Sequence, residues 1–193
     1  MKPLTFIIIF LNTLIVFSQT EKNETILIAN NTWSKESLKM PLSFAPGIEY
    51  EGIEDIRFAE GWSKKDRPDF WTYVFVWHIK GIQKQTIENL EQHLKLYFDG
   101  LMLSANNDEE KIQGASVLFI ENPNKPSSFI GKIKTYDRFH TKEVISLNCT
   151  VDAHYCETSN RSTIVFRLSL KPQKDKVWQK LQEVTVRDGI CKN

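Results

Sequence analysis

The stretch at residues 70–79, FWTYVFVWHI, decides the fold class of this chain. Aromatic and β-branched residues, which are the types most enriched in strands, occupy nearly every position. Both faces of such a strand are apolar, which predicts a place in the middle of a sheet, with cover on both sides or strong curvature. A polar turn at residues 63–68 precedes it.

The clearest helix follows this strand. Thr86 is a suitable N-cap, and Glu88 lies in the first turn, where the helix dipole favours an acidic side chain. Apolar residues then recur at helical spacing: Ile87, Leu90, Leu94, Tyr97, Phe98, Leu101 and Met102. One stripe of this helix must therefore pack on the sheet.

Strand patterns return in the second half of the chain. They cover residues 117–120, 129–139, 143–155 and 162–170. In 143–155 the apolar and polar side chains alternate, which predicts one face on the core and one in water. Short polar connections at 123–126 and 157–160 favour hairpins between antiparallel neighbours. A last helix is expected over residues 175–184.

This order of elements predicts an α+β domain. We expect two layers, in which a twisted, mainly antiparallel sheet is covered on its apolar face by the long central helix and, near its edge, by the C-terminal helix. The order is similar in outline to the cystatin, nuclear-transport-factor and PsbP folds. That similarity covers element order and no motif, so it implies no function.

The first 18 residues have the pattern of a cleavable export signal. Lys2 supplies a positive start, and an apolar run follows to Phe17, with Asn12 and Thr13 as its main interruption. The run is shorter than the roughly 20 residues of a spanning helix. We expect residues 1–18 to be a signal peptide cut before Gln19, and 19–193 to form one periplasmic or secreted domain without stable membrane insertion.

Charge argues against a nucleic-acid partner. Lys2 is the only charged residue of the predicted signal, so removing it takes the net charge from +1 to zero. Proteins that bind nucleic acid usually carry a basic excess, because phosphate contacts supply most of the non-specific affinity. A small ligand or an envelope protein is the expected partner, and the sequence indicates no cofactor.

Three cysteines, Cys149, Cys156 and Cys191, allow one disulfide. On a continuous strand Cys149 and Cys156 would lie ~23 Å apart, far beyond disulfide reach. We therefore expect a Cys156–Cys191 bridge, with Cys149 as a buried free thiol.

The sequence has no Gly-rich phosphate loop, no nucleophile elbow and no Cys-x-x-Cys motif. Asp152 and His154 share one face of the strand at 143–155, where they could act as a base and its orienting partner or bind a metal with one more ligand. The alternative is that they are ordinary polar residues of a solvated sheet face.

Two other sets of residues have a functional and a structural interpretation. His78 and His93 could form part of a metal site if the helix packs on the strand, or satisfy polar groups at the rim of the core. Trp33 and Trp62 lie in turn-rich surroundings and could stack on a ligand such as a sugar, or simply pack.

Acidic residues gather between residues 49 and 60, around Arg57. Paired carboxylates can hydrolyse glycosides, but they must face one cleft. We expect instead a solvated edge in which the acidic residues form an ion pair with Arg57.

These patterns favour an exported, non-catalytic module that binds a small ligand or a protein partner in a groove between the helix and the curved sheet. The alternatives are a small extracytoplasmic enzyme that uses Asp152 and His154, and a metal-binding protein that uses these residues or His78 and His93.

Overall fold

The structure, a computed structural model, describes residues 25–82, 84–105 and 113–192. The predicted signal peptide at residues 1–18 lies outside these ranges. Within the described ranges, no helix combines the length and the apolar character that crossing a membrane requires.

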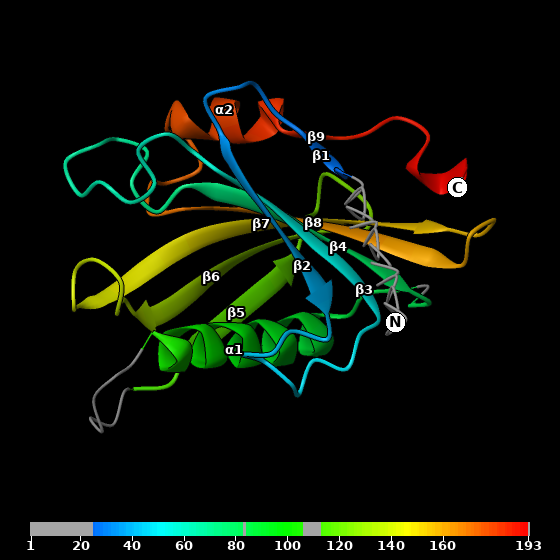
Figure 1. The fold of residues 1–193 in the computed structure, drawn as a ribbon, viewed down its shortest axis with the longest axis horizontal. Helices are drawn as coiled ribbons and strands as arrows, with labels where there is room; N and C mark the ends of the chain where they lie inside the picture. Colours follow the sequence, from blue (N-terminus) through cyan, green and yellow to red (C-terminus); the bar gives the residue numbers. More distant parts are fainter. Residues whose placement is uncertain (1–24, 83, 106–112, 193) are drawn as a thin grey trace, which may run out of the picture.

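A seven-stranded sheet forms the centre of the molecule (Figure 1), with the strand order β2-β3-β4-β8-β7-β6-β5. Its strands are β2 (Ser34–Met40), β3 (Gly52–Phe58), β4 (Tyr73–Lys80), β5 (Ser116–Glu121), β6 (Ser128–Tyr136), β7 (Val144–Cys156) and β8 (Arg161–Ser169). All neighbouring strands are antiparallel. A second sheet pairs β1 (Leu27–Ile28) with β9 (Thr185–Val186). The α+β class predicted from the sequence is confirmed.

The two helices lie on opposite faces of the large sheet (Figure 1), whereas the sequence led us to expect both on one face. Helix α1 (Ile87–Ser104) covers the face that carries Phe75 and Trp77, and α2 (Val177–Glu183) covers the face that carries Val74 and Val76. A short 3-10 turn, η1 (Ile190–Lys192), follows β9. Because β4 is apolar on both faces, it needs cover on both, and α2 with β1 supplies the second cover.

Strand β4 begins three residues later than the start of the apolar run, because Trp71 leaves the extended conformation with φ 51°. Its indole Nε1 donates to Asp137 Oδ2 over 3.0 Å. Asp137 in turn ends β6 earlier than predicted, since its carboxylate accepts from the backbone N–H groups of Phe139, His140 and Thr141. These contacts join the two loops at one end of the sheet.

The acidic segment is not the solvated edge that we expected. Strand β2, which the sequence pattern did not predict, forms the edge, so β3 lies inside the sheet. Glu54, Asp55 and Arg57 are therefore buried, with exposed fractions of 0%, 2% and 4%. The expected ion pair does form, between Asp55 and Arg57, at 2.5 Å.

Candidate functional site: a polar pocket beside the start of α1

A pocket of about 390 Å³ opens where four segments distant in sequence meet. These are the β4–α1 connection, the β5–β6 turn, and the adjoining ends of β7 and β8. Its lining is Ile82, Lys84, Gln85, Glu121, Asn122, Lys125, Pro126, Ser127, Ser128, Phe129, Ala153, His154, Tyr155 and Ser162. We call this the polar pocket.

The expected groove between α1 and the sheet is filled by aromatic side chains. The ring centroids of Phe75 and Phe166 lie 4.4 Å apart, and those of Phe75 and Tyr97 lie 5.2 Å apart. Stacked rings at these distances leave no room for a ligand beside β4 and β8, and the hollow of about 220 Å³ that remains under α1 lies at its C-terminal half, next to Thr135 of β6. The polar pocket lies beside the N-terminal end of α1 instead, because Gln85 directly precedes the N-cap Thr86.

Three polar side chains of the pocket are buried: Gln85, Ser128 and Ser162. The Ser162 hydroxyl donates to the Ile82 carbonyl, and the Ser128 hydroxyl accepts from Asn122 Nδ2 over 3.4 Å. By contrast, Gln85 Nε2 makes no well-formed hydrogen bond among the described residues, although the Gln85 side chain lies near enough to the Tyr50 hydroxyl to act against the rise in the Tyr50 pKa that burial causes.

The backbone is also unusual at this pocket. Ile82 has φ 64° and Ser127 has φ 52°, both in the left-handed region. For a β-branched residue such as Ile82 this conformation is a true outlier. Strain of this kind persists only where the surrounding structure imposes it, and it is concentrated at binding and catalytic sites.

Charges at the pocket come from Lys84 and Lys125 and from Glu121, all of which are exposed. Lys125 Nζ also bonds Asp152 Oδ1 over 2.7 Å. Lys84 and Glu121 lie at the rim, where a ligand of mixed charge could reach both.

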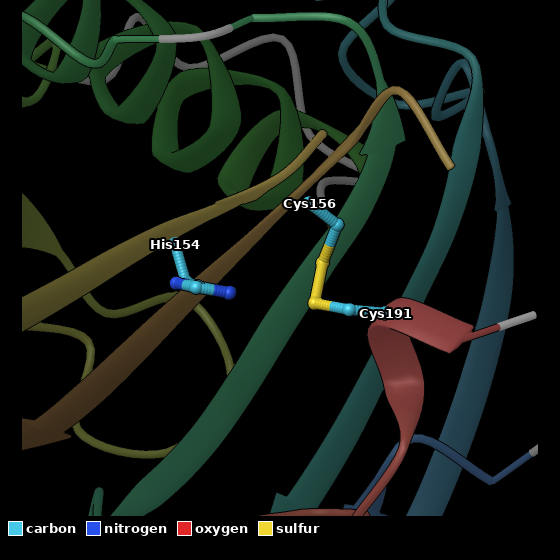
Figure 2. A group of neighbouring side chains, drawn as sticks. All are labelled: His154, Cys156 and Cys191. Carbon is cyan, nitrogen blue, oxygen red and sulfur yellow. A yellow bond between two sulfur atoms is a disulfide. The ribbon is translucent and has the colours of Figure 1, made fainter. Parts of the chain in front are cut away.

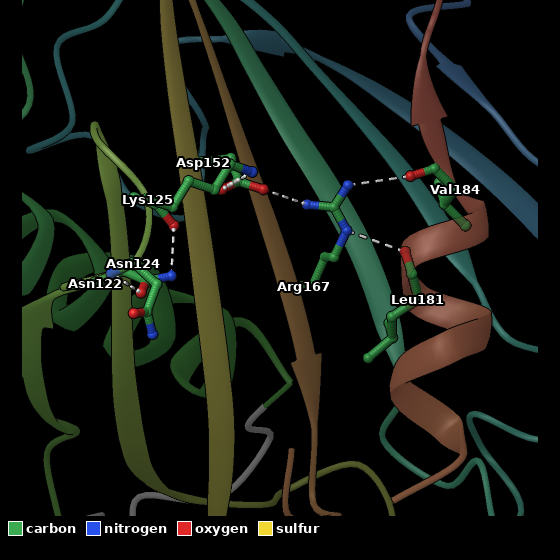
Figure 3. A network of polar contacts seen from close by, with 8 residues as sticks. Asn122, Asn124, Lys125, Asp152, Arg167, Leu181 and Val184 are labelled. Atoms are coloured by element: carbon green, nitrogen blue, oxygen red, sulfur yellow. Dashed lines mark hydrogen bonds and ion pairs between the residues drawn. The ribbon is translucent and has the colours of Figure 1, made fainter. Parts of the chain in front are cut away.

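Asp152 belongs to a network that fastens α2 to the sheet (Figure 3). Arg167 donates to Asp152 Oδ2 over 3.0 Å, and also to the carbonyls of Leu181 and Val184 at the end of α2. Burial of Asp152 raises its pKa, but hydrogen bonds and charges from Lys125 and Arg167, with Ser128, outweigh burial and hold the pKa below its usual value. Asp152 is therefore an ionised structural anchor.

The sequence placed Asp152 and His154 as a base with its orienting partner. Both lie on β7, but no hydrogen bond joins them among the described residues, since the Asp152 carboxylate bonds Lys125 and Arg167 instead. His154 is exposed and lines the polar pocket. His154 can therefore contact a ligand in the pocket, whereas Asp152 has a structural role.

The structure does not bring His78 and His93 together. His78 shares the α2 face of β4, and its Nδ1 lies 3.0 Å from Thr163 Oγ1. His93 lies on α1, on the other side of the sheet, with Nδ1 2.9 Å from the Tyr50 hydroxyl. Burial lowers the pKa of His93, which favours the neutral ring. Both histidines satisfy local polar groups.

Trp33 and Trp62 are half-buried, and both pack against other side chains. Trp33 packs at the edge of the core beneath α2. The Trp62 ring lies 4.5 Å from Phe58 and 5.3 Å from His140, centroid to centroid. These contacts are the ones that the packing interpretation expects, and ligand stacking by the exposed parts of the rings stays a prediction.

Cys156 and Cys191 form a disulfide with a Cα–Cα distance of 5.2 Å, and Cys149 is a buried free thiol. This is the arrangement expected from the spacing along β7. Burial raises the pKa of Cys149 far above its usual value, so its thiolate is not available as a nucleophile.

The sequence did not single out Gln85, and it led us to expect Glu54 on a solvated edge. Gln85 showed no periodic or motif signal, and it becomes distinctive only through its burial beside three other segments. Glu54 is enclosed by the α1 core, where Trp77 Nε1 donates to its Oε1 over 3.3 Å. Burial raises the Glu54 pKa to about 8, although Tyr97 and Trp77 act against burial as hydrogen-bond donors.

Comparison with known proteins adds no function. No protein-family model, no curated protein and no solved structure matches the chain significantly. Function can therefore be inferred only from the site itself.

Proposed function

We propose that this chain is an exported, non-catalytic module that binds a small polar ligand in the polar pocket. One observation carries the proposal: three buried polar side chains from different segments, Gln85, Ser128 and Ser162, converge on the pocket. Ligand sites in proteins typically combine an apolar lining with a few convergent polar groups. Here Phe129, Ile82 and Ala153 supply the apolar part.

A larger hollow among the described residues is a poorer site. It measures about 790 Å³ and lies along β2 and β3, with Ser37, Lys39, Glu51, Lys80 and Arg161 as its polar or charged lining. None of these side chains is buried, and Lys80 is already paired with Glu51 at 2.5 Å. A ligand there would displace water from groups that are already solvated, which yields little affinity.

The charges at the polar pocket favour a small carboxylate that also carries a hydrogen-bond donor, such as an amino acid or a hydroxy acid. Lys84 suits the carboxylate and Glu121 suits the donor. Gln85 Nε2 and the serine hydroxyls provide the directional bonds that fix orientation. The engagement of Asp152 with Lys125 and Arg167 favours binding over the base-and-orienter chemistry considered from the sequence.

A native mass spectrum of the protein isolated from the exported fraction of its own cell tests both parts of the proposal. We expect a chain that begins at Gln19 and carries a small adduct that a denaturing spectrum lacks. A panel of free amino acids and hydroxy acids then identifies the ligand by thermal shift. At 100 times its Kd, a true ligand should raise Tm by roughly 5–10 °C.

Variants then locate the ligand. Lys84→Ser and Glu121→Gln, both at exposed positions of the rim, should each reduce the shift, and Lys174→Ser, exposed and outside the pocket, should not. A spectrum that retains residues 1–18 contradicts export. A panel with no shift, together with identical native and denatured masses, contradicts ligand binding.

A further inference from the structure

Three metal-ligating side chains meet at the end of β7, where the C-terminal segment returns to it. His154 and Cys156 lie two residues apart on β7 and so point to the same face of the strand, and Cys191 comes from η1 (Figure 2). One imidazole nitrogen and the two sulfurs all lie within 4.8 Å of one another. No other group of three such residues is found in the part of the chain that the structure describes.

The disulfide occupies both sulfurs in this structure, so the cluster cannot hold a metal in its oxidised form. The third ligand is already free, because no hydrogen bond of the exposed His154 ring is present within the described residues. To become a metal site, the cluster of His154, Cys156 and Cys191 needs only the conversion of its two bonded sulfurs into thiolates.

We propose that reduction of the Cys156–Cys191 disulfide converts this cluster into a zinc site with three protein ligands. A dithiol reductant supplies two electrons: the S–S bond breaks, both cysteines become thiols, and the dithiol becomes a disulfide. Zn²⁺ then displaces the two thiol protons and binds both sulfurs and one imidazole nitrogen. The fourth coordination position stays open to water or to an external ligand.

The geometry needs only a small change. Ligand atoms on tetrahedral zinc lie about 3.5–3.8 Å apart, given Zn–S near 2.3 Å and Zn–N near 2.0–2.1 Å. The nitrogen already lies within 4.8 Å of both sulfurs, so the main movement is the separation of the two sulfurs. Cys191 is close to the C-terminus and follows Gly189, whose φ is 76°, so the chain there can adjust more easily than β7 can.

The C-terminal segment stays in place after reduction, because other contacts hold it. Thr158 Oγ1 donates to the Cys191 carbonyl over 2.6 Å, and Arg187 N donates to the Ile26 carbonyl over 2.8 Å. Strand β9 also pairs with β1. These bonds keep Cys191 beside Cys156, which lowers the entropic cost of assembling the site.

The donor set decides the class of metal. One imidazole and two thiolates suit zinc and other borderline or soft ions, whereas calcium and magnesium need oxygen ligands that this group lacks. Three protein ligands with one open position is also the coordination pattern of zinc sites that bind or activate an external molecule.

Cobalt(II) is the probe, because a tetrahedral thiolate site gives it visible bands and a sulfur-to-metal charge-transfer band. Untagged protein is reduced with dithiothreitol, freed of the reagent under argon, and titrated with Co²⁺ and then Zn²⁺. We expect one Co²⁺ per chain, its displacement by Zn²⁺, and no bands with the oxidised protein. The oxidised protein also controls for Cys149, which is a thiol in both states.

Variants identify the ligands. His154→Ala should weaken Co²⁺ binding by more than about 100-fold, the upper end of the loss caused by removing a group that only orients a ligand. Cys191→Ser should remove most of the charge-transfer intensity. The control is His93→Gln, on the far side of the sheet, which should leave the bands unchanged.

Three results overturn the proposal. They are equal Co²⁺ binding by the oxidised protein, unchanged affinity in His154→Ala, and a reduced chain whose far-ultraviolet circular dichroism is lost and does not return when Zn²⁺ is added. Ligand binding in the polar pocket is measured on the oxidised protein without metal, so the two proposals succeed or fail separately.

Discussion

Strand β3 carries two neighbouring carboxylates that face opposite sides of the sheet, and the two sides treat them differently. Glu54 enters the aromatic core beneath α1, where its Oε2 has no hydrogen-bond partner among the described residues. Asp55 enters the smaller core beneath α2, where its oxygens accept from Arg57 and from the backbone N–H groups of Ile26 and Leu27. Whether a buried carboxylate stabilises or destabilises the fold therefore depends on its hydrogen-bond partners as well as on its burial.

This difference reflects how the α1 side and the α2 side of the sheet are each stabilised. The α1 side depends on the packing of large rings and tolerates a poorly satisfied acid. The α2 side has a smaller apolar cluster and adds ionic hydrogen bonds: Asp55 and Arg57 hold β1, and Arg167 holds the end of α2. A buried ion pair of this kind is strongly destabilising when one partner is removed, because the other stays charged and buried.

The largest expected effect is on Asp55. Replacing Asp55 by Ala leaves Arg57 buried without its partner and frees two N–H groups of the segment that enters β1. We expect a loss of about 3–5 kcal/mol in the free energy of unfolding, measured in urea. Glu51→Ala, which removes an exposed pair with Lys80, is the control and should leave the urea midpoint unchanged. Equal losses of stability in the two variants would contradict the claim that the buried Asp55–Arg57 pair stabilises the α2 side of the sheet.

Glu54 should make the protein less stable as pH rises. Its pKa is about 8 in the folded protein and near 4.5 when unfolded, so the folded state binds more protons between these values. The contribution of protonated Glu54 to the free energy of unfolding is therefore fully present below pH 4.5 and is lost as pH rises toward 8. We expect stability to fall by roughly 3 kcal/mol between about pH 5 and about pH 7.5 from this group.

The matched variant is Glu54→Gln, which cannot ionise. The difference between wild type and variant in urea unfolding, measured across this pH range, isolates Glu54 from all other titrating groups. A difference that does not depend on pH would mean that the carboxylate is solvated or paired, and the two sides of β3 would then be alike.

The smallest effect concerns the helices themselves. Thr86 Oγ1 accepts from Asn89 N at the start of α1, whereas Lys176 at the start of α2 makes no side-chain capping bond. Thr86→Ala should cost about 1 kcal/mol and Thr86→Ser much less, as seen by thermal unfolding. Lys176→Ala, the equivalent change at α2, should have no effect of this size. Equal losses at both helices would show that local capping does not distinguish the layers.

The sequence was informative where structure depends on near neighbours. The 3.6-residue repeat from Ile87 to Met102 located α1, and the apolar run that ends at Ile79 located a strand inside the sheet. The sequence pattern did not identify β2, because Ser34–Met40 forms an extended strand without the regular alternation of apolar residues that marks most strands. It also failed at Trp71, where a long-range hydrogen bond to Asp137 accompanies a φ that local preference would not choose.

By itself, the sequence determined the α+β class, the positions of both helices and the interior place of β4, because each depends on residues only a few positions apart. Only the tertiary structure decided which layer each carboxylate of β3 faces, and where Gln85, Ser128 and Ser162 meet. The same is true of His154, Cys156 and Cys191, which are brought together by the return of the C-terminal segment to the end of β7. The reason is that such sites form between segments that are far apart in the chain, and no local pattern encodes the path that joins them.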